Sequence, residues 1–124
     1  MGHLPTYRYL ELFDKAAYHF LAELGADFSR GDFGFADVRH EIDYLAEVRA
    51  GALLLVRSWL LAVGRSSLRC RSTLTNVREG TLHARIETVT VYFDLVRRAS
   101  AALPTDFTRR AEGYLAPDDG EKAK

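Results

Sequence analysis

The chain has 124 residues, the size of one domain with a hydrophobic core of its own. Seventeen lysine and arginine side chains balance seventeen aspartate and glutamate side chains, so the overall charge gives no reason to expect a nucleic acid or a membrane as partner. A single cysteine cannot form a disulfide within the chain, and no apolar run reaches the roughly 20 residues needed to cross a bilayer. The residues after Met1 do not resemble a signal peptide, and we therefore expect a cytoplasmic protein.

The first predicted element is a helix over residues 7–24. Its apolar side chains recur at three- and four-residue steps and therefore share one face, which is wide enough to indicate a helix that other elements enclose. Pro5 and Thr6 can begin this helix, and Gly25 can end it. The residues of the repeat are Leu10, Phe13, Ala17, Leu21 and Leu24.

Four predicted strands follow a loop rich in glycine and aspartate. Residues 38–44 alternate between apolar or aromatic and charged side chains, which is the period of a strand with one wet face. Residues 52–63 are apolar almost throughout, and their bounding glycines favour a buried strand over a helix. Residues 67–77 alternate again, and residues 81–96 form a long last strand after a turn at Gly80. The apolar set of this last strand changes face partway, which indicates a bulge or a contact with another subunit.

One helix followed by a run of antiparallel strands predicts an α+β fold, in which a curled sheet wraps around a central helix. From residue 104 the chain becomes polar and ends in DDGEKAK, a composition typical of disorder. The expected domain therefore covers residues 1–106, and residues 107–124 form a polar C-terminal tail.

Three phrases of the chain, MGHLPTYRYLELFD, VGRSSLRCRSTLTN and VYFDLVRRASAALP, stand in a specific order and spacing. Together they resemble the hotdog-fold acyl-CoA thioesterases, in the branch related to 4-hydroxybenzoyl-CoA thioesterase. That family commonly carries D-x-x-G-H-V-N-N-x-x-Y-L-x-x-(F/M)-(D/E) at the start of its central helix, then a v-G-x-S-S hairpin and a v-x-x-D-x-x-x-R-x-x-x-(L/I)-P ending. The resemblance extends to about residue 104 and implies the hotdog fold. The residues that match the first phrase are Gly2, His3, Tyr9, Leu10, Phe13 and Asp14.

The resemblance implies an acyl-CoA thioesterase that cleaves its thioester at the N-terminal end of the central helix, in a site between subunits. Free backbone amides at that end suit the negative charge that develops on the carbonyl oxygen. The matching positions give Gly2, His3 and Thr6 as catalytic residues. The implied ligand is an acyl-CoA, with coenzyme A as part of the substrate and no other cofactor. The residues expected to bind coenzyme A are Arg65, Ser66, Ser67, Arg97, Arg98 and Tyr9.

Two departures from the family pattern bear on turnover. The family's catalytic aspartate would lie three positions before Gly2, outside this chain, and the family's first strand would be absent too. LPT stands where the family reads V-N-N, and Pro5 removes one backbone donor. We therefore expect Met1 to be either an internal methionine or the true start of a shortened relative. The alternative function is a hotdog protein that binds acyl-CoA without hydrolysis, and a pure assembly module is a third.

Other features have plainer interpretations. Ser66 and Ser67 also suit a tight turn, and Arg97 and Arg98 also suit a solvated strand end. The histidines and Cys70 show no metal-ligand spacing, so no metal site is expected. A single curled sheet leaves an edge strand uncovered, and the resemblance implies a homo-oligomer, either a dimer or a tetramer.

Overall fold

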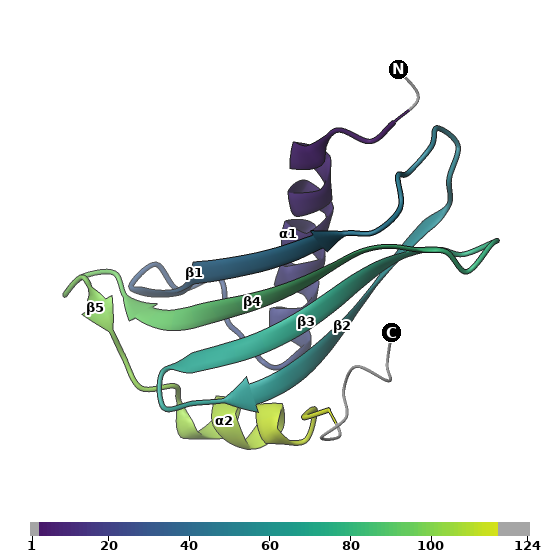
Figure 1. Cartoon of the computed structure of the whole chain (residues 1–124). Coiled ribbons are helices and arrows are strands. Elements are labelled where there is room, and N and C mark those ends of the chain that lie inside the picture. Colours follow the sequence, from purple (N-terminus) through teal and green to yellow (C-terminus); the bar gives the residue numbers. More distant parts are fainter. Residues whose placement is uncertain (1–2, 117–124) are drawn as a thin grey trace.

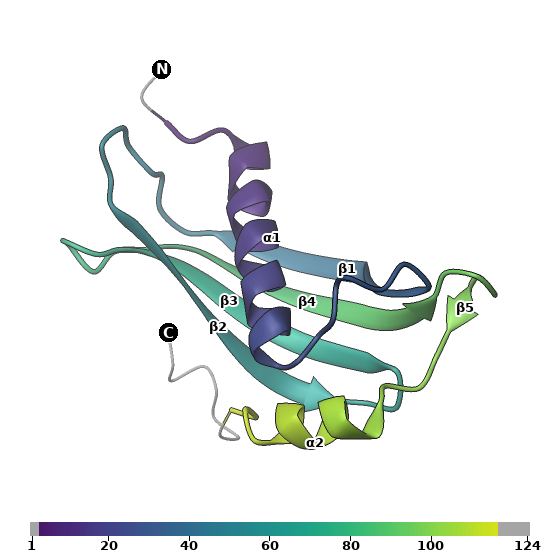
Figure 2. The same cartoon turned by 180° about the vertical axis from the view of Figure 1, so that it is seen from behind.

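The computed structural model describes residues 3–116. Its antiparallel sheet has the strand order β1-β4-β3-β2, with the short β5 paired to β4. The sheet curls around α1, which lies across its concave face (Figures 1 and 2). The predicted α+β hotdog architecture is therefore confirmed. The elements are α1 (Thr6–Glu23), β1 (Phe33–Tyr44), β2 (Leu54–Val63), β3 (Ser67–Asn76), β4 (Leu82–Asp94), β5 (Ala99–Ser100) and α2 (Thr105–Glu112).

The helix α1 forms where the apolar repeat predicts it. Tyr9, Phe13 and Leu21 are its buried residues and lie on the face that meets the sheet. Gly25 follows the last turn with a φ of 105°, a conformation that a residue with a Cβ atom rarely adopts. The predicted glycine stop is confirmed.

A bulge at Val38 changes which side chains of β1 face the helix. The register of β1 against β4 shifts between Asp37 and Arg39, so Val38 has no partner and is 63% exposed. In a regular strand Asp37 and His40 would point to opposite faces. The extra residue brings them to the same face, where His40 Nε2 lies 3.5 Å from Asp37 Oδ2. The prediction that Val38 shares a face with His40 is wrong for this reason.

The apolar residues of β4 change face without a bulge at the point of change. The register of β4 with β3 is continuous from Ala84 to Val91. Ala84 and Ile86 are buried against α1, and Thr88 and Thr90 continue the same inner face. Polar side chains thus face inward in the second half of the strand. The apolar residues of this half face outward, and they are Val89, Val91 and Phe93.

A second helix occupies part of the segment that composition predicts to be a polar tail. α2 buries Phe107 and Ala111, which lie one turn apart, among core residues of α1 and the sheet. Two apolar residues in a short polar segment are too weak a signal to predict a helix. The expectation of disorder is therefore wrong for residues 107–112, and residues 117–124 lie outside the described residues.

The core has two clusters, one toward each end of α1. The cluster near the N-terminal end includes Tyr9, Phe13 and Ile86, and the other includes Leu21 and Leu60. Neither helix within residues 3–116 combines the length and apolar character that crossing a bilayer requires.

Candidate functional site

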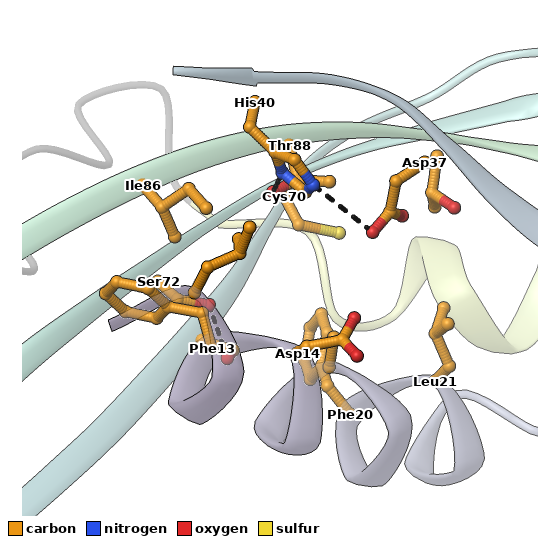
Figure 3. A pocket seen from close by; sticks show the side chains of 14 residues that line it. Phe13, Asp14, Phe20, Leu21, Asp37, His40, Cys70, Ser72, Ile86 and Thr88 are labelled. Atoms are coloured by element: carbon orange, nitrogen blue, oxygen red, sulfur yellow. Dashed lines mark hydrogen bonds and ion pairs between the residues drawn. The ribbon is translucent and has the colours of Figure 1, made fainter. Parts of the chain in front are cut away.

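A cavity lies between the middle of α1 and the inner face of the sheet, at the junction of the two core clusters (Figure 3). It holds about 40 Å³. One water molecule needs about 10–15 Å³ on this scale, so there is room for roughly three or four non-hydrogen atoms. Its helical wall is mostly apolar, with Phe13, Phe20 and Leu21. Its sheet wall carries four hydroxyl groups and a thiol, those of Ser58, Ser72, Thr88, Thr90 and Cys70.

Most of these hydroxyl groups have partners within the wall. Ser58 Oγ lies 2.7 Å from Ser72 Oγ, and His40 Nδ1 lies 3.0 Å from Thr88 Oγ1. Thr90 differs, because its side chain is 3% exposed and its Oγ1 has no hydrogen-bond partner among the described residues. A buried hydroxyl group in this state can hydrogen-bond to a water or a ligand in the cavity.

Two carboxylates face the cavity from opposite sides. Asp14 projects from α1 and Asp37 from β1, as Figure 3 shows. Burial, together with the nearby negative charge of Asp37, raises the pKa of the Cys70 thiol to about 12. This thiol therefore stays protonated and unreactive at neutral pH.

The N-terminal end of α1 carries two of the predicted catalytic residues. His3 Nδ1 lies 2.9 Å from Oε2 of Glu47, and both side chains are more than half exposed. Within residues 3–116 nothing accepts a hydrogen bond from the amides of Thr6 and Tyr7. The first turn contains no acidic residue, so the positive end of the helix dipole is uncompensated there. Gly2 lies outside the described residues.

Arg65 and Ser66 lie in the turn between β2 and β3, and Ser67 is the first residue of β3. The carbonyl oxygens of Arg65 and Ser66 accept hydrogen bonds of 2.8 Å from the amides of Leu103 and Tyr92. The turn therefore connects β4 to the segment before α2, and the Arg65 side chain is exposed.

Arg97 and Arg98 lie in the turn after β4. The side chain of Arg97 is 86% exposed, with its Nε 3.9 Å from Asp94 Oδ2. Arg98 has a φ of 61°, and its guanidinium lies 5.7 Å from the centre of the Phe93 ring. Both guanidinium groups are free to meet an external anion.

One subunit does not bring the predicted residues together. His3 and Thr6 lie at the N-terminal end of α1, whereas the turns that hold Arg65 and Arg97 lie toward its C-terminal end (Figures 1 and 2). Tyr9 belongs to neither group. It is 5% exposed, and its ring packs edge-on against that of Tyr44 at 5.1 Å between centroids, so we remove it from the coenzyme A residues.

The sequence pattern did not mark Asp37, His40 or Thr90 as site residues, and Asp14, which the family phrase matches, is exposed on α1. Asp37 and His40 share a face only through the bulge, which depends on pairing with a distant strand. The available signal was the row of small polar residues at inward positions of β3 and β4. In the described part of the chain, no group of three or more histidine, cysteine, aspartate or glutamate side chains is placed to hold a metal ion.

A sequence model of the thioesterase-like superfamily matches residues 1–111, and the chain belongs to that superfamily. Among curated proteins, it is 29% identical over 121 residues to the L-carnitine dehydrogenase/betainyl-CoA thioesterase of Agrobacterium fabrum (strain C58). The match covers 96% of this chain and 25% of that protein, so the chain spans about a quarter of the relative's length.

Solved structures share the fold. The hypothetical protein SAV2348 from Staphylococcus aureus, solved in complex with CoA, superposes with a TM-score of 0.86 at 19% identity, covering 94% of this chain and 77% of that one. A thioesterase from Thermus thermophilus, complexed with coenzyme A and Zn, superposes with a TM-score of 0.77 at 26% identity, covering 89% of this chain and 84% of that one. These matches agree with the predicted family.

Proposed function

We propose that this chain is an acyl-CoA thioesterase that cleaves its thioester at the N-terminal end of α1. The observation that carries the proposal is the His3–Glu47 pair, at 2.9 Å. His3 precedes Thr6 and Tyr7 in the chain, and the amides of these two residues donate no hydrogen bond within residues 3–116. Two amide donors at the positive end of a helix suit the oxyanion of a tetrahedral intermediate. The superfamily and the coenzyme A complexes of its structural neighbours support the same activity.

The mechanism follows from the roles that these groups can take. Glu47 accepts the Nδ1 proton of a neutral His3, which leaves Nε2 as the general base. As Nε2 takes a proton from water, the water oxygen attacks the thioester carbon, and the carbonyl oxygen accepts hydrogen bonds from the two amides. Collapse of this intermediate breaks the carbon–sulfur bond. The proton on His3 then goes to the departing thiolate, and the products are a carboxylic acid and coenzyme A.

We further propose that the acyl group occupies the cavity of a second subunit. Thr6 and Asp14 are eight residues apart, which is about 12 Å along α1 at a rise of 1.5 Å per residue. A short acyl group with its thioester at Thr6 cannot reach the cavity of the same subunit. Within the described residues β1 pairs with β4 alone, and its free edge favours pairing with a second copy. Arg65, Arg97 and Arg98 stay the proposed contacts for the coenzyme A phosphates.

The test is release of free coenzyme A thiol from a panel of acyl-CoAs, including the betainyl-CoA named for the Agrobacterium relative. We expect His3→Ala to lower kcat by about 100-fold or more, which is the usual size of a general-base contribution. His19→Ala, on the exposed side of α1, is the matched control and should keep full activity. A wild-type protein that releases thiol from no member of the panel contradicts the proposal.

Binding of acyl-CoA without hydrolysis is the second candidate function. It is favoured by the exposure of the proposed base, since the His3 and Glu47 side chains are 61% and 53% exposed. A general base open to water loses the benefit of a desolvated site. Thermal stabilisation by acyl-CoAs with no release of thiol would select this function.

A further inference from the structure

We infer that the cavity between α1 and β1 selects a short acyl group that carries a positive charge, a specificity that rests on the proposed thioesterase function. Asp14 and Asp37 line this cavity from opposite walls, and Figure 3 shows their carboxylates turned toward one another. A cation that enters between them meets two negative charges at once.

Asp14 and Asp37 are both exposed to solvent, and within residues 3–116 few charged groups oppose them. For Asp14, no ion pair or hydrogen bond occurs among residues 3–116, and no lysine or arginine lines the cavity. The ion-pair partner of Asp37 is His40, with 3.5 Å between Nε2 and Oδ2. His40 also approaches Thr88 Oγ1 at 3.0 Å, so its ring is held at the wall. A cationic ligand would supply the compensation that the wall lacks.

Thr90 provides an independent observation. Its Oγ1 is an unpartnered polar atom on a side chain that is 3% exposed, and it lines the same cavity. Leaving a buried hydroxyl group unpaired costs free energy, so the occupant is expected to bring a polar or charged group to it. Burial is the main cause of the raised pKa of Cys70, and the negative charge of Asp37 raises it further.

The size and lining of the cavity define the rest of the acyl group. Space for roughly three or four non-hydrogen atoms matches a trimethylammonium group, and Asp14 and Asp37 also line a second pocket of about 240 Å³. The aromatic side chains of Phe13 and Phe20 on the helical wall suit the methyl groups of a quaternary ammonium. The hydroxyl groups of the sheet wall are a poor surface for a fatty acyl chain.

A larger cavity near α2 is the rival location for a cation. It holds about 200 Å³ and is lined by aromatic residues together with Asp27, Asp106 and Arg30. The Asp27 carboxylate already accepts hydrogen bonds of 2.6 and 3.0 Å from the hydroxyl and amide of Ser29. Its charge is thus engaged within the chain, whereas that of Asp14 is not.

The experiment compares two acyl-CoAs of the same shape. Betainyl-CoA carries a quaternary nitrogen, and tert-butylacetyl-CoA replaces this nitrogen with carbon. We expect the wild-type protein to favour betainyl-CoA by about tenfold or more in kcat/KM. The double variant Asp14→Asn/Asp37→Asn should reduce the preference to about twofold or less. Asp43→Asn, on the outer face of β1, removes the same charge and should keep the wild-type preference.

Binding of non-hydrolysable ketone analogues, in which a methylene group replaces the sulfur, separates this inference from the proposed function. If neither thioester is hydrolysed but the cationic ketone binds more tightly than the neutral one, the inference is supported and the thioesterase proposal is overturned. No hydrolysis and equal binding overturns both. If the wild-type protein hydrolyses the two thioesters equally well, the inference alone is overturned. The same holds if the double variant keeps the wild-type preference for betainyl-CoA.

Discussion

Thr90 holds a buried hydroxyl group with no partner within the described chain, which costs the unliganded protein free energy. We expect Thr90→Val, which keeps the shape of the side chain, to leave the free energy of unfolding unchanged or to raise it by about 1 kcal/mol. Urea denaturation measures this change. A loss of more than about 1 kcal/mol would mean that the hydroxyl group has a partner in the folded protein.

Cys70 lies in the same cavity wall, where burial and Asp37 raise the pKa of its thiol to about 12. Because the thiolate is the reactive form, the thiol should react slowly with a disulfide reagent at pH 8 in the native protein and rapidly after denaturation. The rate in the native protein should increase with pH up to the raised pKa. Equal rates in the native and denatured protein would contradict the placement of Cys70.

Glu87 on the outer face of β4 accepts a hydrogen bond of 2.6 Å from Arg71, which lowers the pKa of its carboxyl group from the ordinary 4.5, with a smaller contribution from Arg69. A pKa that is lower in the folded state contributes stability above the ordinary value. This contribution disappears as the pH falls through the lowered one. We expect Glu87→Gln to lose about 1 kcal/mol at neutral pH and little in acid. Urea midpoints at both pH values provide the measurement, and a difference independent of pH would contradict the assignment.

At the scale of elements, apolar patterns together with glycine signals were sufficient to predict α1 and the four long strands, although β1 begins at Phe33 rather than at residue 38. Each element must bury its own apolar face, so the pattern of apolar residues within a segment indicates whether that segment is a helix or a strand. The bulge at Val38 could not be predicted, because it arises from the pairing of β1 with β4. In β4 the apolar residues move from the inner face to the outer face partway along the strand, and the sequence shows only that the apolar pattern changes. The cause is visible only in the structure, where Thr88 and Thr90 face a cavity rather than a packed core.

The second helix, α2, packs against the core and buries Phe107. The ring of Phe107 lies 5.6 Å from that of Phe35 in β1, measured between centroids. We expect Phe107→Ala to lower the free energy of unfolding by about 3 kcal/mol, as for other buried aromatic residues. Asp106→Ala, whose side chain is 99% exposed, is the control and should change it by a few tenths of a kcal/mol at most. Equal effects of the two substitutions in urea denaturation would show that α2 does not dock.

At the scale of the whole molecule, the resemblance proposes residues near the two ends of α1, and it does not propose the cavity that the structure shows between them. The resemblance marked His3 and Thr6 at one end of α1 and the arginine turns at the other. The cavity between them combines α1, β1 and β4, and only the folded sheet brings Asp14, Asp37 and Thr90 together. No local motif in any one of these segments contains that information.

Within residues 3–116 one edge of β1 is unpaired, and this edge predicts a dimer. We expect sedimentation equilibrium to give twice the mass of the chain, or a multiple of the dimer. A monomer that retains full thioesterase activity would contradict the shared site. It would also leave the distance of about 12 Å between Thr6 and Asp14 unexplained.

The most direct test of the shared site is hydrolysis of betainyl-CoA by mixed subunits, one carrying His3→Ala and the other Asp14→Asn/Asp37→Asn. A random mixture contains half heterodimers, in each of which one of the two sites combines an intact base with an intact cavity. Co-refolding the two variants should therefore raise kcat/KM for betainyl-CoA to about one quarter of the wild-type value or more, above the average of the two variants measured separately. Activity no greater than that of the separate variants would contradict a thioester cleaved between two copies of this chain.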